Sequence, residues 1–130
     1  MERDNLKIYH YSNKNFNDKI KVEYFGYNTY SFNDTKYSIK RSFFYTEKKI
    51  AEYHLKDSKY CYITEIEKTK LYNLKEDKEN LKSKFIDITE LLNYLKVRYL
   101  GIIYNVGFNI VSLFYDIKFS KKIDLTLDKV

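Results

Sequence analysis

The sequence has no proline, no tryptophan, three glycines, one cysteine and two histidines in 130 residues. Collagen-like repeats, proline-rich linkers and glycine-rich phosphate loops are therefore excluded, because each needs proline or clustered glycines. One cysteine excludes a disulfide scaffold within the chain and is typical of a reducing compartment. Two histidines and one cysteine are too few for a Cys/His-type structural zinc site. Apolar runs are short and residues 1–5 are charged, so we expect neither a membrane span nor a signal peptide.

Aromatic side chains are abundant: the sequence has 15 Tyr and 9 Phe, and 44% of its residues are hydrophobic. A chain of this length and hydrophobicity can bury one core and has no room for a second. No linker-like stretch and no internal repeat divides it. We therefore expect a single domain over residues 1–130, with a core that is rich in rings.

The net charge is +6, but only three of the 24 basic residues are arginine, namely Arg3, Arg41 and Arg98. A basic domain suggests an acidic or polyanionic partner, nucleic acid included. Lysine, however, is a point charge that lacks the forked recognition of arginine. High Lys, Asn, Ile and Tyr content is also what an A+T-rich genome produces. Both interpretations of the charge stay open at this stage.

Alternation of apolar and polar residues predicts most of the secondary structure. Strands are expected at residues 6–11, 20–25, 37–46 and 59–67, with a short extension at 71–74 and closing strands at 102–104 and 109–119. Helices are expected at residues 47–55, at 76–84 as an exposed element, and at 88–99 behind a capping box of Asp87 and Glu90. This order predicts an α+β fold in which a split, mostly antiparallel sheet packs on two or three helices.

Two side chains attract attention on chemical grounds. His10 lies mid-strand between two tyrosines, where an imidazole either donates a hydrogen bond to a ligand hydroxyl or is a partly buried, satisfied histidine. Cys61 lies inside a strand, where a small buried thiol is the usual interpretation. Residues 26–35 are polar and aromatic, and form either a binding loop or a tyrosine-bearing turn.

Three segments resemble ADP-ribosyltransferase-like proteins when they are taken in order. Residues 8–12, Ile-Tyr-His-Tyr-Ser, resemble the first motif of members with a His-first signature. Residues 41–46, Arg-Ser-Phe-Phe-Tyr-Thr, with a predicted helix behind them, resemble the second motif. Residues 95–103 and then 110–114 resemble the closing helix, glycine turn and apolar strand. Phage-encoded anti-defence proteins of this size, including an anti-CRISPR, have a similar pattern.

The resemblance implies NAD as cofactor and gives residues roles toward it. His10 would hydrogen-bond the ribose of NAD, and Tyr45 would stack on the nicotinamide ring. The other implied cofactor-binding residues are Ser12, Arg41, which would face a phosphate, and Thr46, which would hold the strand–helix corner. We accordingly expect His10 and Tyr45 to line one cleft that is sized for a dinucleotide.

The sequence departs from the family pattern at the last catalytic position, where those enzymes carry an acid. No glutamate follows Leu91, and Asn105 occupies about the expected place, with Asp116 as a later acidic alternative. Asparagine can hydrogen-bond a ribose hydroxyl but carries no negative charge. Asn105 is therefore the third predicted catalytic residue, while weak or lost turnover stays open.

Two functions follow as expectations. The first is an NAD-dependent ADP-ribosyltransferase that modifies a host protein or nucleic acid as a phage counter-defence factor in the host cytoplasm. The alternative is a non-enzymatic, anti-CRISPR-like inhibitor that binds a nucleic-acid-handling host complex through a Lys/Tyr surface. That surface would consist of Tyr24, Tyr27, Tyr30, Tyr37 and Tyr45 with Lys19, Lys21, Lys36 and Lys40. The competing interpretation is that tyrosine replaces other apolar residues in the core.

Overall fold

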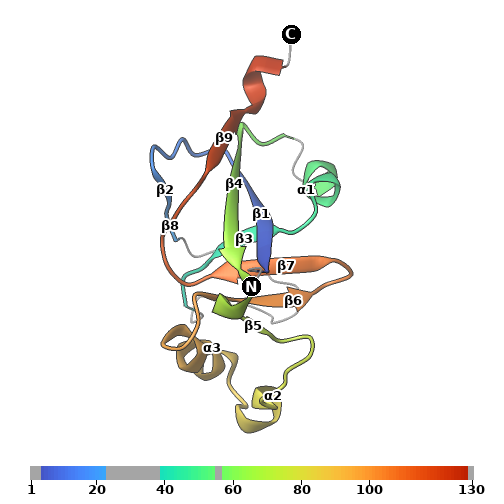
Figure 1. Cartoon of the computed structure of the whole chain (residues 1–130), viewed down its shortest axis with the longest axis vertical. Helices are drawn as coiled ribbons and strands as arrows, with labels where there is room; N and C mark the ends of the chain where they lie inside the picture. Colours follow the sequence, from blue (N-terminus) through green and yellow to red (C-terminus); the bar gives the residue numbers. More distant parts are fainter. Residues whose placement is uncertain (1–3, 23–38, 55–56, 129–130) are drawn as a thin grey trace.

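The computed structural model describes residues 4–22, 39–54 and 57–128, and within them the chain is α+β with a mostly antiparallel sheet (Figure 1). The main sheet has seven strands in the order β5 (Leu71–Asn73), β6 (Gly101–Asn105), β7 (Asn109–Leu113), β3 (Ser42–Tyr45), β1 (Asn5–Ser12), β4 (Tyr60–Glu67) and β9 (Lys121–Asp124). A separate two-stranded ladder joins β2 (Lys19–Ile20) to β8 (Ile117–Lys118). The helices are α1 (Lys48–His54), α2 (Leu81–Lys84) and α3 (Ile88–Lys96), and short 3-10 turns occupy Lys68–Lys70 and Leu125–Asp128. The expected α+β class is confirmed.

The two longest strands are those with the clearest alternation. β1 and β4 pair antiparallel along their whole length, from Asn5 opposite Glu67 to Ser12 opposite Tyr60. Among the strand pairs of the described residues, only β5–β6 is parallel. Figure 1 shows β1 and β4 lengthwise with β6 and β7 lying across them, so the sheet is strongly twisted, as sheets of L-residues are.

The helix expected over residues 76–84 is largely wrong. Only Leu81–Lys84 is helical, and Asp77 and Asn80 have φ values of 47° and 55°. These left-handed conformations break a right-handed helix, and Asp and Asn adopt them more readily than other residues do. The segment is therefore a turn that leads into a short helix. The strand expected over 109–119 is also broken: it ends at Leu113, and only β8 (Ile117–Lys118) lies in the rest of that range.

α3 begins where the capping box predicted. The Asp87 carboxylate accepts a hydrogen bond from the Thr89 amide at 2.8 Å, which satisfies one of the unpaired amides of the first turn. Leu91, Leu92 and Leu95 are buried on one face of the helix. The helix ends at Lys96, three residues earlier than expected.

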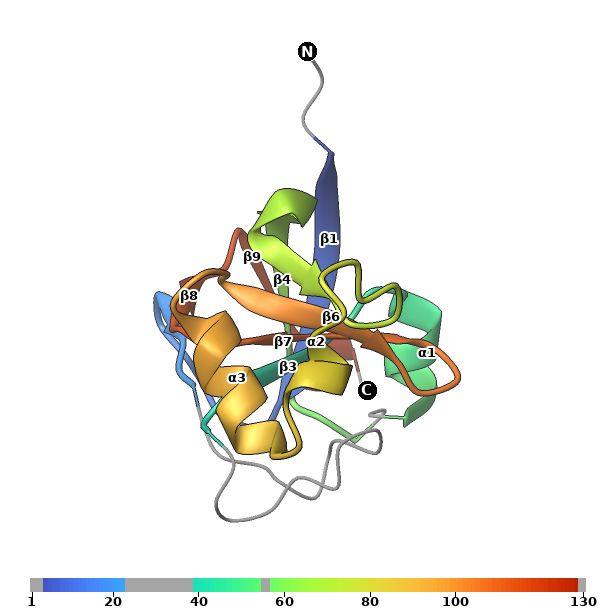
Figure 2. The ribbon, with the colours of Figure 1, turned by 90° about the horizontal axis from the view of Figure 1, so that it is seen from below.

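The sheet has two covered faces, which differ in what lies on them. On the helix face, α3 packs on Ile102, Tyr104 and Ile110, and Ala51 of α1 packs on Tyr11. α3 and α1 lie toward opposite ends of the β6–β7 hairpin (Figure 2). On the other face, which we call the ladder face, residues of the β2–β8 ladder pack on the sheet. This second cluster includes Ile8, Phe44, Tyr62 and Val111 of the sheet and Ile20 of β2.

Candidate functional site

His10 and Tyr45 lie on opposite faces of the sheet, so the expectation that they line one cleft is wrong. Tyr9 is directly opposite Tyr45 in the β1–β3 pair, and residues opposite one another share a face. His10, the next residue, therefore points the other way. The ring contacts agree: His10 lies 5.1 Å from Phe44 on the ladder face, whereas Tyr45 stacks on Phe108 at 5.6 Å, centroid to centroid.

The His10 imidazole takes part in the fold itself. Its Nδ1 lies 2.7 Å from the Phe43 carbonyl oxygen, and because a carbonyl only accepts, Nδ1 carries the proton. The ring also lies near Phe16 and Tyr62, with centroids 6.4 and 6.2 Å away. The β1–β3 pair has a single register pair, so this side chain supplies a donor where the backbone ladder stops. The arrangement fits the alternative of a half-buried, satisfied histidine.

Asn105 does not join either residue. It ends β6, and β7 and β3 lie between β6 and β1, which places Asn105 about 14 Å across the sheet from the strand of His10. Tyr104, the residue before it, is in register with Ile110 and Tyr45, so Asn105 is on the opposite face from Tyr45. Its Oδ1 accepts from the Gly107 amide at 3.0 Å, and its Nδ2 donates to Asn109 Oδ1 at 3.1 Å. Gly107 has φ of +97°, as hairpin turns require. Asn105 thus organises the β6–β7 turn, and the predicted catalytic residues do not converge.

The predicted cofactor-binding residues are also separated. Arg41 shares the helix face with Tyr45, but only 1% of it is exposed. Its Nη1 is 3.4 Å from Ser112 Oγ, and its guanidinium lies 5.1 Å from the Phe43 ring centroid. A side chain so buried cannot reach a cofactor phosphate without rearrangement.

Ser12 and Thr46 lie at strand ends rather than in a shared pocket. The Ser12 hydroxyl accepts from the Lys14 amide at 3.0 Å in the turn after β1. Thr46 is half-buried directly after β3. Asp116, the acidic alternative to Asn105, accepts from the Val22 amide at 2.8 Å and lies 3.5 Å from Lys21 Nζ. Its carboxylate therefore holds the segment after β2.

Cys61 is the small buried thiol that its position predicted. It is fully buried beside Tyr11 and Ala51. Burial raises the pKa of the Cys61 thiol, a shift that a hydrogen bond with Tyr11 and the nearby Lys48 only partly oppose. Burial also raises the pKa of the Tyr11 hydroxyl, helped by its bond to Cys61. Both groups stay protonated at neutral pH, so nothing here activates a nucleophile.

Most of the predicted Lys/Tyr surface lies outside the described residues, namely Tyr24, Tyr27, Tyr30, Lys36 and Tyr37. The predicted binding loop at residues 26–35 lies outside them too. Of the remaining members of the Lys/Tyr surface, Lys19, Lys21 and Lys40 are exposed. Tyr45 packs into the protein on Phe108.

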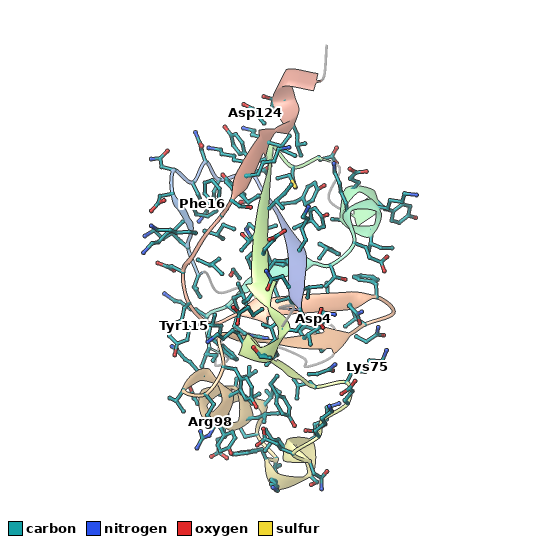
Figure 3. All side chains as sticks on the ribbon, viewed as in Figure 1. Asp4, Phe16, Lys75, Arg98, Tyr115 and Asp124 are labelled. Atoms are coloured by element: carbon teal, nitrogen blue, oxygen red, sulfur yellow. The ribbon has the colours of Figure 1, made fainter. Side chains whose placement is uncertain are left out.

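A different basic and aromatic site lies at the C-terminal end of α3, which we call the basic pocket. It has a volume of about 420 Å³ and is lined by Thr69, Lys70, Lys96, Val97, Arg98, Tyr99, Leu100 and Tyr115. Three of these side chains are cationic, and none of the lining residues in the described part of the chain is acidic. In Figure 3, Arg98 and Tyr115 lie on one side of the molecule around α3, and Lys75 lies on the other.

Backbone hydrogen bonds bring the three segments of the basic pocket together. The Leu100 amide donates to the Lys70 carbonyl at 2.8 Å, and the Phe114 amide donates to the Leu100 carbonyl at 2.9 Å. The turn after β4, the end of α3 and the segment after β7 therefore meet at one place. Because sheet pairing brings these three segments together, no local pattern in the sequence predicts the basic pocket.

Two of the cations are held in position by aromatic neighbours. The Arg98 guanidinium carbon lies 3.7 Å from the Tyr94 ring centroid, and its Nη1 donates to the Tyr94 carbonyl at 2.8 Å. Lys96 Nζ lies 5.6 Å from the Tyr115 ring centroid, and the Tyr115 hydroxyl donates to the Lys96 carbonyl at 2.6 Å. Such contacts are favourable for arginine and lysine. The signal that sequence reasoning missed is Arg98, one of three arginines, four residues after Tyr94.

The rim of the basic pocket exposes apolar surface as well. Val97 is 76% exposed, Leu100 38% and Tyr115 42%. Tyr99 donates from its hydroxyl to Glu79 at 2.9 Å, and burial together with that carboxylate raises the pKa of Tyr99. The pocket thus combines fixed cations, neutral phenols and some apolar area.

A second pocket, of about 410 Å³, lies between α2, α3 and the end of β6. Its lining includes Phe85, Ile86 and Ile88, with Lys75 and Lys82 beside them. Ile86 is fully exposed. These two lysines provide a comparison for the cations of the basic pocket.

No family model, curated protein or solved structure matches the chain. Among the described residues, no helix is long and apolar enough to cross a membrane, and no three His, Cys, Asp or Glu side chains gather as metal ligands.

Proposed function

We propose that the protein is a non-enzymatic binding module that acts by binding an anionic partner through the basic pocket. The observation that carries this proposal is the convergence of Lys70, Lys96 and Arg98 on one 420 Å³ pocket whose described lining has no acidic residue. The partner class agrees with the nucleic-acid-handling complex expected from the sequence. A net charge of +6 would speed the approach of such a partner.

The basic pocket lies at the C-terminal end of α3, where the helix dipole acts against anion binding. Backbone carbonyls at that end carry partial negative charge, which by itself repels anions. Here the Leu95 carbonyl accepts from the Arg98 and Tyr99 amides, and the Lys96 carbonyl accepts from Tyr115. These bonds occupy the last carbonyls, and three full positive charges outweigh the remaining dipole.

The ADP-ribosyltransferase expected from the sequence stays a prediction that the geometry does not favour. His10 and Tyr45 lie on opposite faces, and Asn105 lies about 14 Å across the sheet from β1. Transfer of ADP-ribose needs the catalytic side chains within hydrogen-bonding reach of one substrate. Binding of an anionic partner needs only the basic pocket.

The proposal is tested by titrating the full chain with inorganic polyphosphate and measuring affinity by calorimetry. The triple variant K70A/K96A/R98A removes the pocket charges, and K75A/K82A/K84A removes the same charge elsewhere. We expect the first variant to bind at least tenfold more weakly and the second within about threefold of wild type, since exposed charges contribute little singly but act together at one site. Equal losses in both variants would refute the pocket, because net charge alone would then explain binding.

A second measurement separates the proposal from the enzyme. The chain is incubated with labelled NAD and host lysate, with His10→Ala as control. We expect no label on any protein or nucleic acid. Label transfer by the wild type would overturn the binding-module proposal in favour of a transferase, and its loss in a His10→Ala variant that circular dichroism shows to be folded would assign the reaction to His10.

A further inference from the structure

We propose that the ligand of the basic pocket is single-stranded nucleic acid, with a base stacked on the Arg98–Tyr94 layer and phosphates on Lys70 and Lys96. This inference rests on the proposed function and specifies its ligand. It depends on the flat surfaces in the pocket as well as on its charge.

Arg98 forms one platform for a base. Its guanidinium carbon lies 3.7 Å from the Tyr94 ring centroid, the separation of stacked layers. The hydrogen bond from Nη1 to the Tyr94 carbonyl fixes the rotation of the guanidinium. Tyr94 is itself buttressed by Phe85, whose ring centroid is 5.2 Å away. Because Arg98 is exposed and lines the pocket, a planar ligand can stack on this preorganised cationic layer.

Tyr115 forms a second platform. It is 42% exposed, and its hydroxyl is anchored on the Lys96 carbonyl, so the ring is held while part of its surface faces solvent. Lys96 and Lys70 line the same pocket and supply its positive charge together with Arg98. Bases stacked on rings with phosphates on lysines is the recognition pattern of single-strand-binding surfaces.

The same features disfavour two other polyanions. In a duplex the bases are stacked inside the helix, and their faces cannot reach Arg98 or Tyr115. An acidic protein segment would satisfy the three cations but has no flat π-surface to place on the two platforms. The volume of about 420 Å³ lies in the range of small-ligand pockets, which suits one or two nucleotides.

The inference is tested by fluorescence anisotropy with four labelled ligands of matched charge. These are a 12-nucleotide oligo(dT), an abasic strand of the same length, a duplex of equal phosphate count, and a 12-residue polyglutamate. The full chain should bind oligo(dT) at least fivefold more tightly than the abasic strand, because stacking on an aromatic or guanidinium plane favours a base. The logarithm of its affinity should fall with the logarithm of salt concentration with a slope of about −2, for three cations on a single strand.

Two variants separate stacking from charge. Arg98→Lys keeps the charge and removes the plane but leaves the Tyr115 platform, so it should at least halve the preference for oligo(dT) over the abasic strand. Tyr115→Leu should weaken oligo(dT) about fivefold and leave polyphosphate unchanged. Lys75→Arg, in the second pocket, should change neither. Far-UV circular dichroism and thermal melts show that each variant is folded.

The outcomes distinguish this inference from the proposed function. Equal affinity for oligo(dT) and the abasic strand, or tighter binding of the duplex, overturns the single-strand inference and leaves the binding module standing. Tighter binding of polyglutamate than of oligo(dT) assigns the pocket to an acidic protein and also overturns the inference. If neither these ligands nor polyphosphate binds, both proposals fail together.

Discussion

Replacing Asp77 by alanine should destabilise the protein by about 3 kcal/mol, because its carboxylate ties the turn between β5 and α2 to the Tyr72 side chain and to the first turn of α2. Asp77 Oδ1 accepts from the Tyr72 hydroxyl and from the Leu81 amide at 2.9 Å, and Oδ2 accepts from the Lys82 amide at 3.0 Å. Two of these donors are the unpaired amides at the start of α2. Asp77 also has φ of 47°, where alanine is strained.

The magnitude is the sum of three losses. Removing a helix-capping carboxylate costs about 1 kcal/mol. Leaving the hydroxyl of the buried Tyr72 without its charged acceptor costs roughly 1 kcal/mol. The cost is no larger because the Glu79 amide still donates to that hydroxyl. A left-handed alanine costs roughly 1 kcal/mol more. For 130 residues this corresponds to a melting temperature lower by about 10 °C.

The assay is urea unfolding followed by circular dichroism, with Asp77→Asn and Asp87→Ala as comparisons. Asparagine retains one acceptor and tolerates positive φ, and Asp87 caps α3 through one amide, so each should cost about 1 kcal/mol. A loss below 1 kcal/mol in Asp77→Ala would refute the argument that this carboxylate organises the turn.

The pH dependence of the same variant adds a second criterion. Burial opposes ionisation of Asp77, but hydrogen bonds from Tyr72 and from the Lys82 and Leu81 amides outweigh it and lower the pKa of the carboxyl. A pKa that is lower in the folded than in the unfolded state stabilises the protein above the unfolded pKa of about 4, and that stabilisation disappears as pH falls through the folded pKa. The stability difference between wild type and Asp77→Ala should therefore narrow below about pH 4. A constant difference from pH 7 to pH 2 would contradict this.

Three further predictions concern the sheet. A Cβ at Gly101 would lie 2.3 Å from the Ser112 carbonyl oxygen, so Gly101→Ala should lower the free energy of unfolding in urea by about 3 kcal/mol. A neutral effect would contradict this close approach of β6 to β7. Tyr62→Phe removes a hydroxyl that donates to the Lys14 carbonyl and accepts from the Phe16 amide, so it should lower the free energy of unfolding by about 1–2 kcal/mol. A loss under about 0.5 kcal/mol would contradict this. Burial raises the pKa of Cys61, so its thiol should react with a disulfide reagent at pH 8 only upon unfolding; rapid reaction of the native protein would show that it is accessible.

Much of the fold follows from local patterns. Alternation over β1 and β4 predicted two strands close to their observed bounds, because side chains in a strand alternate between faces. The capping box of Asp87 and Glu90 predicted the start of α3. The turn at residues 76–80 did not follow, because its conformation depends on the carboxylate of Asp77 reaching Tyr72 and α2.

The basic pocket shows why function was harder to predict than fold. Lys70, Arg98 and Tyr115 are far apart in the sequence, and each alone resembles an ordinary surface residue. Only the pairing of β5 with β6 and of β6 with β7 brings their segments together. The motif at residues 8–12 was locally conspicuous, yet its imidazole bonds to the Phe43 carbonyl.

The sequence by itself determined which residues within one strand share a face, so it placed Arg41 with Tyr45 and His10 with Ser12. It did not determine how the faces of different strands correspond. That depends on register: Tyr9, and not His10, lies opposite Tyr45. A shift of one residue would have put His10 and Tyr45 on the same face. Register is set by how the apolar faces of all the strands pack together, so only the tertiary structure could decide whether the predicted catalytic pair meets.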